Sequence, residues 1–167
     1  MKNTPFVSQN TLFGGFIGLS FILASYVFFQ AGQPVSLNPQ LNNVLMLLSI
    51  AGAFIGTRKY REEQLGGTLR YAQALGICVY LIATASVLYG CYIYILYRTH
   101  PELLENYLEM TADMLEEVYK DSPLLENMQV ILKSFMNAGV IAISEVFNKI
   151  FTGFIFSLFL AGILRRK

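Results

Sequence analysis

Four long apolar segments alternate with polar connectors along the chain. The apolar segments cover residues 11–29, 41–57, 71–97 and 138–164. A helix of about 20 apolar residues crosses the roughly 30 Å hydrocarbon core of a bilayer. The pattern therefore predicts an all-α integral membrane protein, with four transmembrane helices in one membrane domain that comprises the whole chain.

The first two connectors are short and predict sharp reversals. Pro34, Asn38 and Pro39 interrupt the first, which makes the flanking spans an antiparallel hairpin. The second covers residues 58–70, and its Gly66-Gly67 pair suits a tight turn with positive φ. It also carries a group of basic residues: Arg58, Lys59, Arg61 and Arg70.

The connector between the third and fourth spans, about residues 100–136, is much longer and more acidic. Its apolar residues recur at helical spacing, with charged residues opposite them. Pro101 followed by Glu102 is typical of a helix start, and Asp121-Ser122-Pro123 indicates the turn between two helices. We expect an amphipathic helical hairpin outside the hydrocarbon.

Composition supports the membrane assignment and adds detail to the third span. Charged residues make up 14% of the chain, against roughly 25% in soluble domains. Cys78 and Cys91 are thirteen residues apart and face different ways on one helix, so they are expected to be unbridged and both buried. Tyrosines near the end of this span suggest an interfacial aromatic belt: Tyr89, Tyr92, Tyr94 and Tyr97.

The distribution of basic residues predicts the orientation, because lysine and arginine stay on the cytoplasmic side. Four spans place both termini and the second connector on one side. That side carries eight of the twelve basic residues: Lys2, Arg58, Lys59, Arg61, Arg70, Arg165, Arg166 and Lys167. We therefore expect both termini to be cytoplasmic and the acidic hairpin to be extracytoplasmic.

Small residues recur every fourth position within each span. Such rows let helix backbones approach closely in a membrane. They serve either packing within one monomer or the docking of a second copy or a partner span. The candidate packing residues are Gly14, Gly18, Gly52, Gly56, Ser86, Gly90, Gly153, Ser157 and Ala161.

A candidate polar site lies near the start of the fourth span, at Glu145, Asn148 and Lys149. Glu145 and Lys149 are four residues apart and can pair on one helix face. Counting back from Leu164 places them near the outer membrane boundary, where Lys149 can snorkel to water. The alternative is a buried pair that lines a polar cavity.

The sequence offers no set of residues that predicts catalysis. His100 is the only histidine and precedes a proline, which is typical of a capping or interfacial residue. We find neither metal-ligand spacing, nor a serine with a nearby base, nor a phosphate-binding glycine loop. We expect no enzyme activity, no metal or other cofactor, and no nucleic-acid partner.

One stretch carries a family resemblance. KYREEQLGG, followed by Gln73-Ala74 and Gly76, together with the hairpin and the closing RRK, resembles the family known as domain of unknown function 4199. The resemblance implies a small four-helix inner-membrane protein, mainly of bacteroidete bacteria, with no established activity. It also suggests relatives encoded beside membrane glycosyltransferases that use polyprenyl phosphates.

Three functional hypotheses follow. The first is a non-enzymatic membrane scaffold or accessory subunit that presents the hairpin or the basic connector to a membrane-protein partner, or forms a homo-oligomer. The second is a small carrier or channel-like protein that uses Glu145 and Lys149. The third, which rests on the resemblance alone, is an accessory to a polyprenyl-phosphate-dependent glycosyltransferase. All three place the protein in a bacterial inner membrane as a multi-pass protein in contact with lipid.

Overall fold

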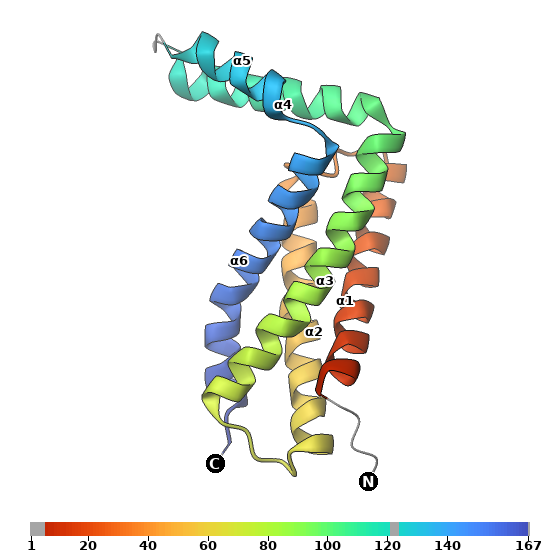
Figure 1. The fold of residues 1–167 in the computed structure, drawn as a ribbon, viewed down its shortest axis with the longest axis vertical. Helices are drawn as coiled ribbons and strands as arrows, with labels where there is room; N and C mark the ends of the chain where they lie inside the picture. Colours follow the sequence, from red (N-terminus) through yellow and green to blue (C-terminus); the bar gives the residue numbers. More distant parts are fainter. Residues whose placement is uncertain (1–5, 121–123, 167) are drawn as a thin grey trace.

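The computed structural model describes residues 6–120 and 124–166 and is all-α (Figure 1). Its helices are α1 (Phe6–Gln30), α2 (Pro39–Gln64), α3 (Tyr71–Thr99), α4 (Pro101–Tyr119), α5 (Leu125–Phe135) and α6 (Ala138–Leu164). Helices α1, α2, α3 and α6 form a bundle, and each is long and apolar enough to cross a membrane. The predicted all-α fold with four long apolar helices is confirmed.

Helix α2 is longer than the sequence suggests, because it continues through half of the basic connector. The Arg58–Glu62 and Lys59–Glu63 pairs lie four residues apart on its surface, a spacing that stabilises helices. The chain reverses only after Leu65, at Gly66 and Gly67, whose φ angles are 60° and 89°. The expected positive-φ turn is confirmed, but the non-helical connector is only six residues long, from 65 to 70.

Helix α3 lies at the centre of the bundle, where it packs against α1, α2 and α6. The core includes Phe21 of α1, Leu45 of α2 and Leu81 of α3, all fully buried. The expectation that both cysteines of α3 are buried is wrong. Cys78 is buried, but Cys91 is exposed on the outer face, since thirteen residues place the two side chains on different faces of the helix.

The tyrosines of α3 do not form a common interfacial belt. Tyr89 and Tyr97 are buried, whereas Tyr94 is exposed. Because α3 has neighbours on several sides, inward-facing positions at helical spacing belong to the core even near the helix end. The belt expected from composition is therefore wrong for Tyr89 and Tyr97.

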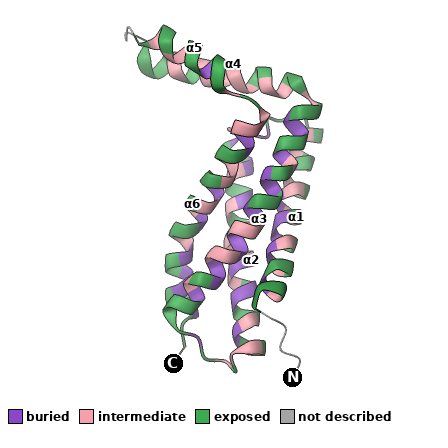
Figure 2. Cartoon of the chain, in the orientation of Figure 1, coloured by how far each residue is buried: buried purple, intermediate pink, exposed green. Residues whose placement is uncertain are grey.

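Helices α4 and α5 pack side by side and lie across one end of the bundle (Figure 1). The expected helical hairpin is present, although its turn at residues 121–123 lies outside the described residues. No described residue of α4 is buried, and Leu132 is the buried residue of α5 (Figure 2). Leu103, Leu104 and Tyr107 attach the start of α4 to the core.

Candidate functional site

The candidate polar site is built on the first half of α6. Asn137 caps this helix, and its side-chain oxygen accepts hydrogen bonds from the amides of Gly139 and Val140 at 3.0 and 3.1 Å. Lys149 follows after three helical turns. Its side chain points into the bundle and the residue is only 8% exposed, so it does not extend to the surface as a snorkelling lysine would.

Lys149 has two polar partners. Its Nζ lies 3.3 Å from Oε2 of Glu145 and donates a 2.6 Å hydrogen bond to Oδ1 of Asn42 on α2. Among the described residues, no donor forms a hydrogen bond with that Glu145 oxygen. The Lys149 ammonium is therefore the main group that offsets the negative charge of Glu145. The three side chains join α2 to α6 inside the bundle.

Asn42 is the residue that sequence reasoning missed. The Asn42-Asn43 pair lies at the start of the second apolar segment and was not among the candidate site residues. A polar pair within an apolar segment was the available signal, but the sequence does not show which residue of α6 faces it. Asn148 does not join the buried group and is exposed at the side of the bundle.

Aromatic and small polar groups surround the ammonium. The ring centroid of Tyr89 lies 5.9 Å from Nζ of Lys149, close enough for a cation–π interaction. The Tyr89 hydroxyl accepts a 3.1 Å hydrogen bond from Ser25 of α1. Beside this group, between α2 and α6, is a pocket of about 200 Å³ whose lining includes Asn43, Ser49, Asn148, Lys149 and Thr152. The arrangement can hold one ion pair away from water.

The candidate packing residues face neighbouring helices of the same chain. A Cβ on Gly14 would lie 2.7 Å from Thr84 Cβ, and one on Gly153 would lie 2.5 Å from Ile82 Cγ2. Gly18, Gly52, Gly56 and Gly90 are crowded in the same way, by Ala85, Ile17, Leu81 and Val146 respectively. Ser86, Ser157 and Ala161 are fully buried. All nine therefore lie at helix contacts within one molecule.

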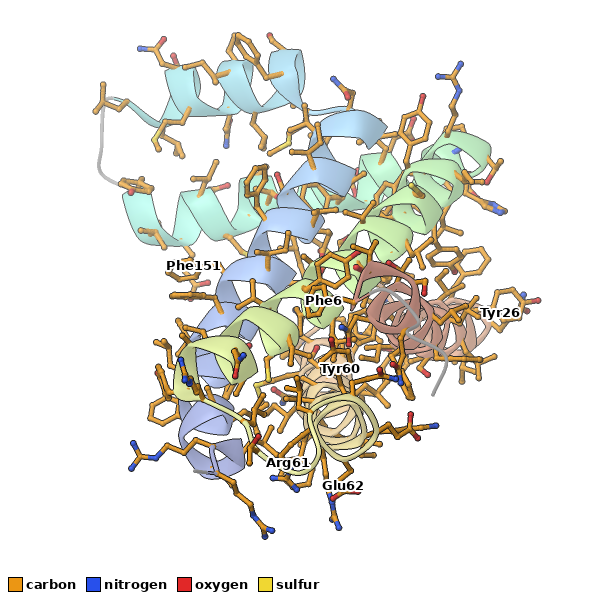
Figure 3. All side chains as sticks on the ribbon, turned by 60° about the horizontal axis from the view of Figure 1, so that its bottom comes forward. Phe6, Tyr26, Tyr60, Arg61, Glu62 and Phe151 are labelled. Carbon is orange, nitrogen blue, oxygen red and sulfur yellow. The ribbon has the colours of Figure 1, made fainter. Side chains whose placement is uncertain are left out.

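The basic residues of the second connector are not one free patch. Arg58 Nε lies 2.9 Å from Glu62 Oε1, and Lys59 Nζ lies 3.7 Å from Glu63 Oε1. Arg61 is buried, and its guanidinium donates to the Leu164 carbonyl at 3.2 Å, near Glu62 at the end of α2 (Figure 3). Within the described residues, Arg70 alone of these four has no acidic partner.

His100 joins α3 to α4. Its Nδ1 lies 3.0 Å from Oε1 of Glu102, and its ring centroid lies 4.9 Å from that of Phe29. The backbone amide of Glu102 at the helix start and the His100 ring both lower the pKa of the Glu102 carboxyl. In the part of the chain that the structure describes, no three histidine, cysteine or carboxylate side chains lie close enough together to hold a metal ion. His100 is therefore not part of such a group.

One comparison with known proteins identifies a family. The family model described as "Protein of unknown function (DUF4199)" matches residues 11–166. The match includes most of α1 and all of the other five helices, so the chain belongs to this family. No curated protein and no solved structure matches the chain.

Proposed function

We propose that this member of the DUF4199 family is a non-enzymatic membrane scaffold or accessory subunit, whose α4–α5 hairpin binds a second membrane protein. The hairpin carries the proposal, because it projects beyond the bundle and is weakly attached to it (Figure 2). In this proposal the protein lies in a bacterial inner membrane, with both termini cytoplasmic and the hairpin on the opposite side.

Exposed apolar side chains on the hairpin support a binding role. Val118 of α4 and Phe135 of α5 are 71% and 70% exposed, and Val130 and Ile131 are also exposed. Among these residues, Ile131 and Phe135 are four apart on one face of α5, and exposed apolar side chains that lie together are typical of interaction surfaces. The hairpin therefore offers apolar anchors that its own packing leaves uncovered.

The charge of the hairpin indicates the kind of partner. Its two helices contain seven acidic residues: Glu102, Glu105, Glu109, Asp113, Glu116, Glu117 and Glu126. Lys133 is the single lysine or arginine in these two helices, and Lys120 directly follows α4. A strongly acidic surface attracts a basic protein surface and is repelled by anionic lipid. The partner that fits is a membrane protein with a basic, partly apolar surface beside the bilayer.

Cross-linking in native membranes tests this proposal. The protein is purified in a mild detergent and its cross-linked partners are identified by mass spectrometry. We expect a stoichiometric partner with the unmodified protein, and its loss with Ile131→Gln/Phe135→Gln. The matched control Asn127→Ser/Ser134→Ala changes exposed polar residues of the same helix and should retain the partner. Self-cross-links alone, or equal loss in both variants, would contradict the proposal.

The buried ion pair supports a second candidate, a small carrier or channel-like protein. Ionisable residues inside a membrane bundle are functional candidates by default, and Lys149 lines a pocket to which several polar side chains contribute. Liposomes loaded with a pH-sensitive dye test it with protons as the probe. A carrier should conduct protons and lose conduction in Glu145→Gln while remaining folded. A scaffold should conduct none in either form.

A further inference from the structure

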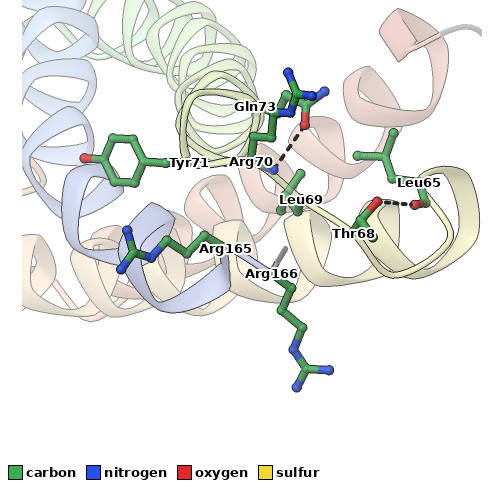
Figure 4. Close-up of a pocket in the computed structure, with 8 residues that line it drawn as sticks. All are labelled: Leu65, Thr68, Leu69, Arg70, Tyr71, Gln73, Arg165 and Arg166. Carbon is green, nitrogen blue, oxygen red and sulfur yellow. Dashed lines mark hydrogen bonds between the residues drawn. The ribbon is translucent and has the colours of Figure 1, made fainter.

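An open pocket lies at the end of the bundle opposite the hairpin, where α3 begins and α6 ends (Figure 4). Its volume is about 1010 Å³. Three arginines line it, Arg70 from the connector and Arg165 and Arg166 from the end of α6. Leu69 and Tyr71 add an apolar component beside these charges. No candidate residue group predicted from sequence combines these segments.

Tertiary contacts fix the two sides of this pocket. Leu69 and Arg166 exchange two backbone hydrogen bonds, both 2.9 Å long, in an antiparallel bridge. The buried Arg61 guanidinium also donates to the Leu164 carbonyl, which fixes the end of α6. Two basic segments almost one hundred residues apart therefore lie together at a defined place. The arginine side chains are not needed for this bridge, because it is made by the backbone.

The charges of this pocket are available to a ligand. Arg70, Arg165 and Arg166 are exposed, and no carboxylate among the described residues forms an ion pair with them. By contrast, Arg58 and Lys59 on the neighbouring turns of α2 are paired with Glu62 and Glu63. In Figure 4 the side chains of Arg70, Arg165 and Arg166 point in different directions, which limits the repulsion between their guanidinium groups. As far as residues 6–120 and 124–166 show, the site is thus a cationic pocket without an internal counter-ion.

Its position indicates where the anion comes from. Tyr71 and Leu164 are the terminal residues of two apolar helices that are long enough to cross a bilayer, so the pocket lies where hydrocarbon gives way to water. The Tyr71 hydroxyl donates to the Leu158 carbonyl at 3.3 Å, which holds an aromatic ring at this level. Lipid phosphates occupy this depth, and arginine binds phosphate oxygens through pairs of parallel hydrogen bonds.

We propose that this arginine pocket binds the phosphate head group of an anionic membrane lipid. The guanidinium groups contact phosphate oxygens, while the acyl chains continue along the apolar surface beside Tyr71. This site is independent of the hairpin and of the proposed scaffold role. The contact holds this end of the bundle at one leaflet. It also makes the protein prefer anionic lipids in that leaflet.

Native mass spectrometry of the full chain in detergent micelles with added phosphatidylglycerol tests the site. The test variant is Arg165→Gln/Arg166→Gln, and the matched control is Arg58→Gln/Lys59→Gln, which removes the same charge at the same end. Each arginine at an anionic surface contributes roughly a factor of five in affinity, so the test variant should bind about 25-fold more weakly. The control should change affinity less than about twofold, since neither Arg58 nor Lys59 lines the pocket and both are solvent-exposed charges screened by salt.

Several outcomes would overturn the proposal. Equal weakening in both variants would mean general electrostatic attraction, and no weakening in either would mean that the pocket binds no lipid. Displacement of phosphatidylglycerol by millimolar inorganic phosphate would assign the site to free phosphate instead.

Arg70→Gln gives a further variant, with an expected loss of affinity of about fivefold. Thermal unfolding of each variant verifies that exposed side chains were removed without loss of fold.

Discussion

At the scale of single residues, Lys149 shows how an apolar segment tolerates a charge. Removing two charges from water costs several kcal/mol per ion, so a buried pair persists only with good partners. Lys149 has a carboxylate one helical turn away and an amide oxygen on α2. Lys149 therefore links α6 to α2 through Asn42, and the charges of Lys149 and Glu145 offset each other inside the bundle.

Replacing one partner of this pair should be more harmful than replacing both. We expect Lys149→Met to lower the free energy of unfolding by about 3–5 kcal/mol, because Glu145 would remain buried without its counter-charge. Glu145→Gln/Lys149→Met should recover most of that loss. Unfolding in detergent micelles, followed by circular dichroism, measures both. A double variant as unstable as Lys149→Met would contradict the pairing.

Two glycines of α6 allow a matched test of helix packing. Gly153 faces Ile82, whereas a Cβ on Gly162 would meet nothing within 4 Å. Gly153→Ala should lower the free energy of unfolding by roughly 1–3 kcal/mol through overpacking. Gly162→Ala should leave it unchanged or raise it by up to about 1 kcal/mol, since alanine favours the helix. Thermal unfolding compares the two, and equal effects would exclude a packing role for Gly153.

At the scale of elements, the hairpin differs from the bundle in how it is held. Helix α3 contacts three other long helices, while α4 and α5 chiefly contact each other. Local opening requires the loss of fewer buried contacts in the hairpin. The same element thus has the exposed apolar side chains and the weaker attachment that a binding module needs.

Hydrogen exchange should separate these two classes of helix. We expect backbone amides of α4 and α5 to exchange at least about tenfold faster than those at the centre of α3, because their helices bury almost no side chains. Exchange in detergent micelles, read by mass spectrometry, measures this difference. Addition of the partner should slow exchange in α5 selectively. Equal protection of α3 and α5 in the isolated protein would contradict the weaker attachment of the hairpin.

At the scale of the whole molecule, the fold puts the two kinds of charge at opposite ends. The α2–α3 connector and the end of α6 lie at one end of the bundle, and the acidic hairpin lies at the other (Figure 1). Because basic segments stay in the cytoplasm, this separation supports the proposed orientation. It also means that a partner of the hairpin and a lipid in the arginine pocket would bind on different sides of the membrane.

Labelling of single cysteines tests that orientation. Thr68→Cys and Ser134→Cys are introduced at exposed positions after both natural cysteines are replaced. A membrane-impermeant maleimide added to spheroplasts should label Ser134→Cys directly. It should label Thr68→Cys only after the membrane is permeabilised. Labelling of both positions without permeabilisation would contradict the arrangement, and the reverse pattern would invert the orientation.

The sequence alone determined the helix types and their order, because hydrophobic period, segment length and turn residues act over short distances. The four apolar helices, the glycine turn and the amphipathic hairpin follow from such local signals. Which face of each helix becomes buried was harder to predict from the sequence. Cys91, Tyr89 and Tyr97 were misassigned because exposure depends on where neighbouring helices lie, and no local pattern contains that information.

Only the tertiary structure decided which distant residues meet. Asn42 and Lys149 are more than one hundred residues apart, and their hydrogen bond exists because α2 packs beside α6. In the same way, the bridge between Leu69 and Arg166 brings three arginines together at one pocket. Sequence showed the basic residues of the connector but not which of them glutamates neutralise. Local chemistry specifies helices, whereas sites arise from their packing, which depends on the whole bundle at once.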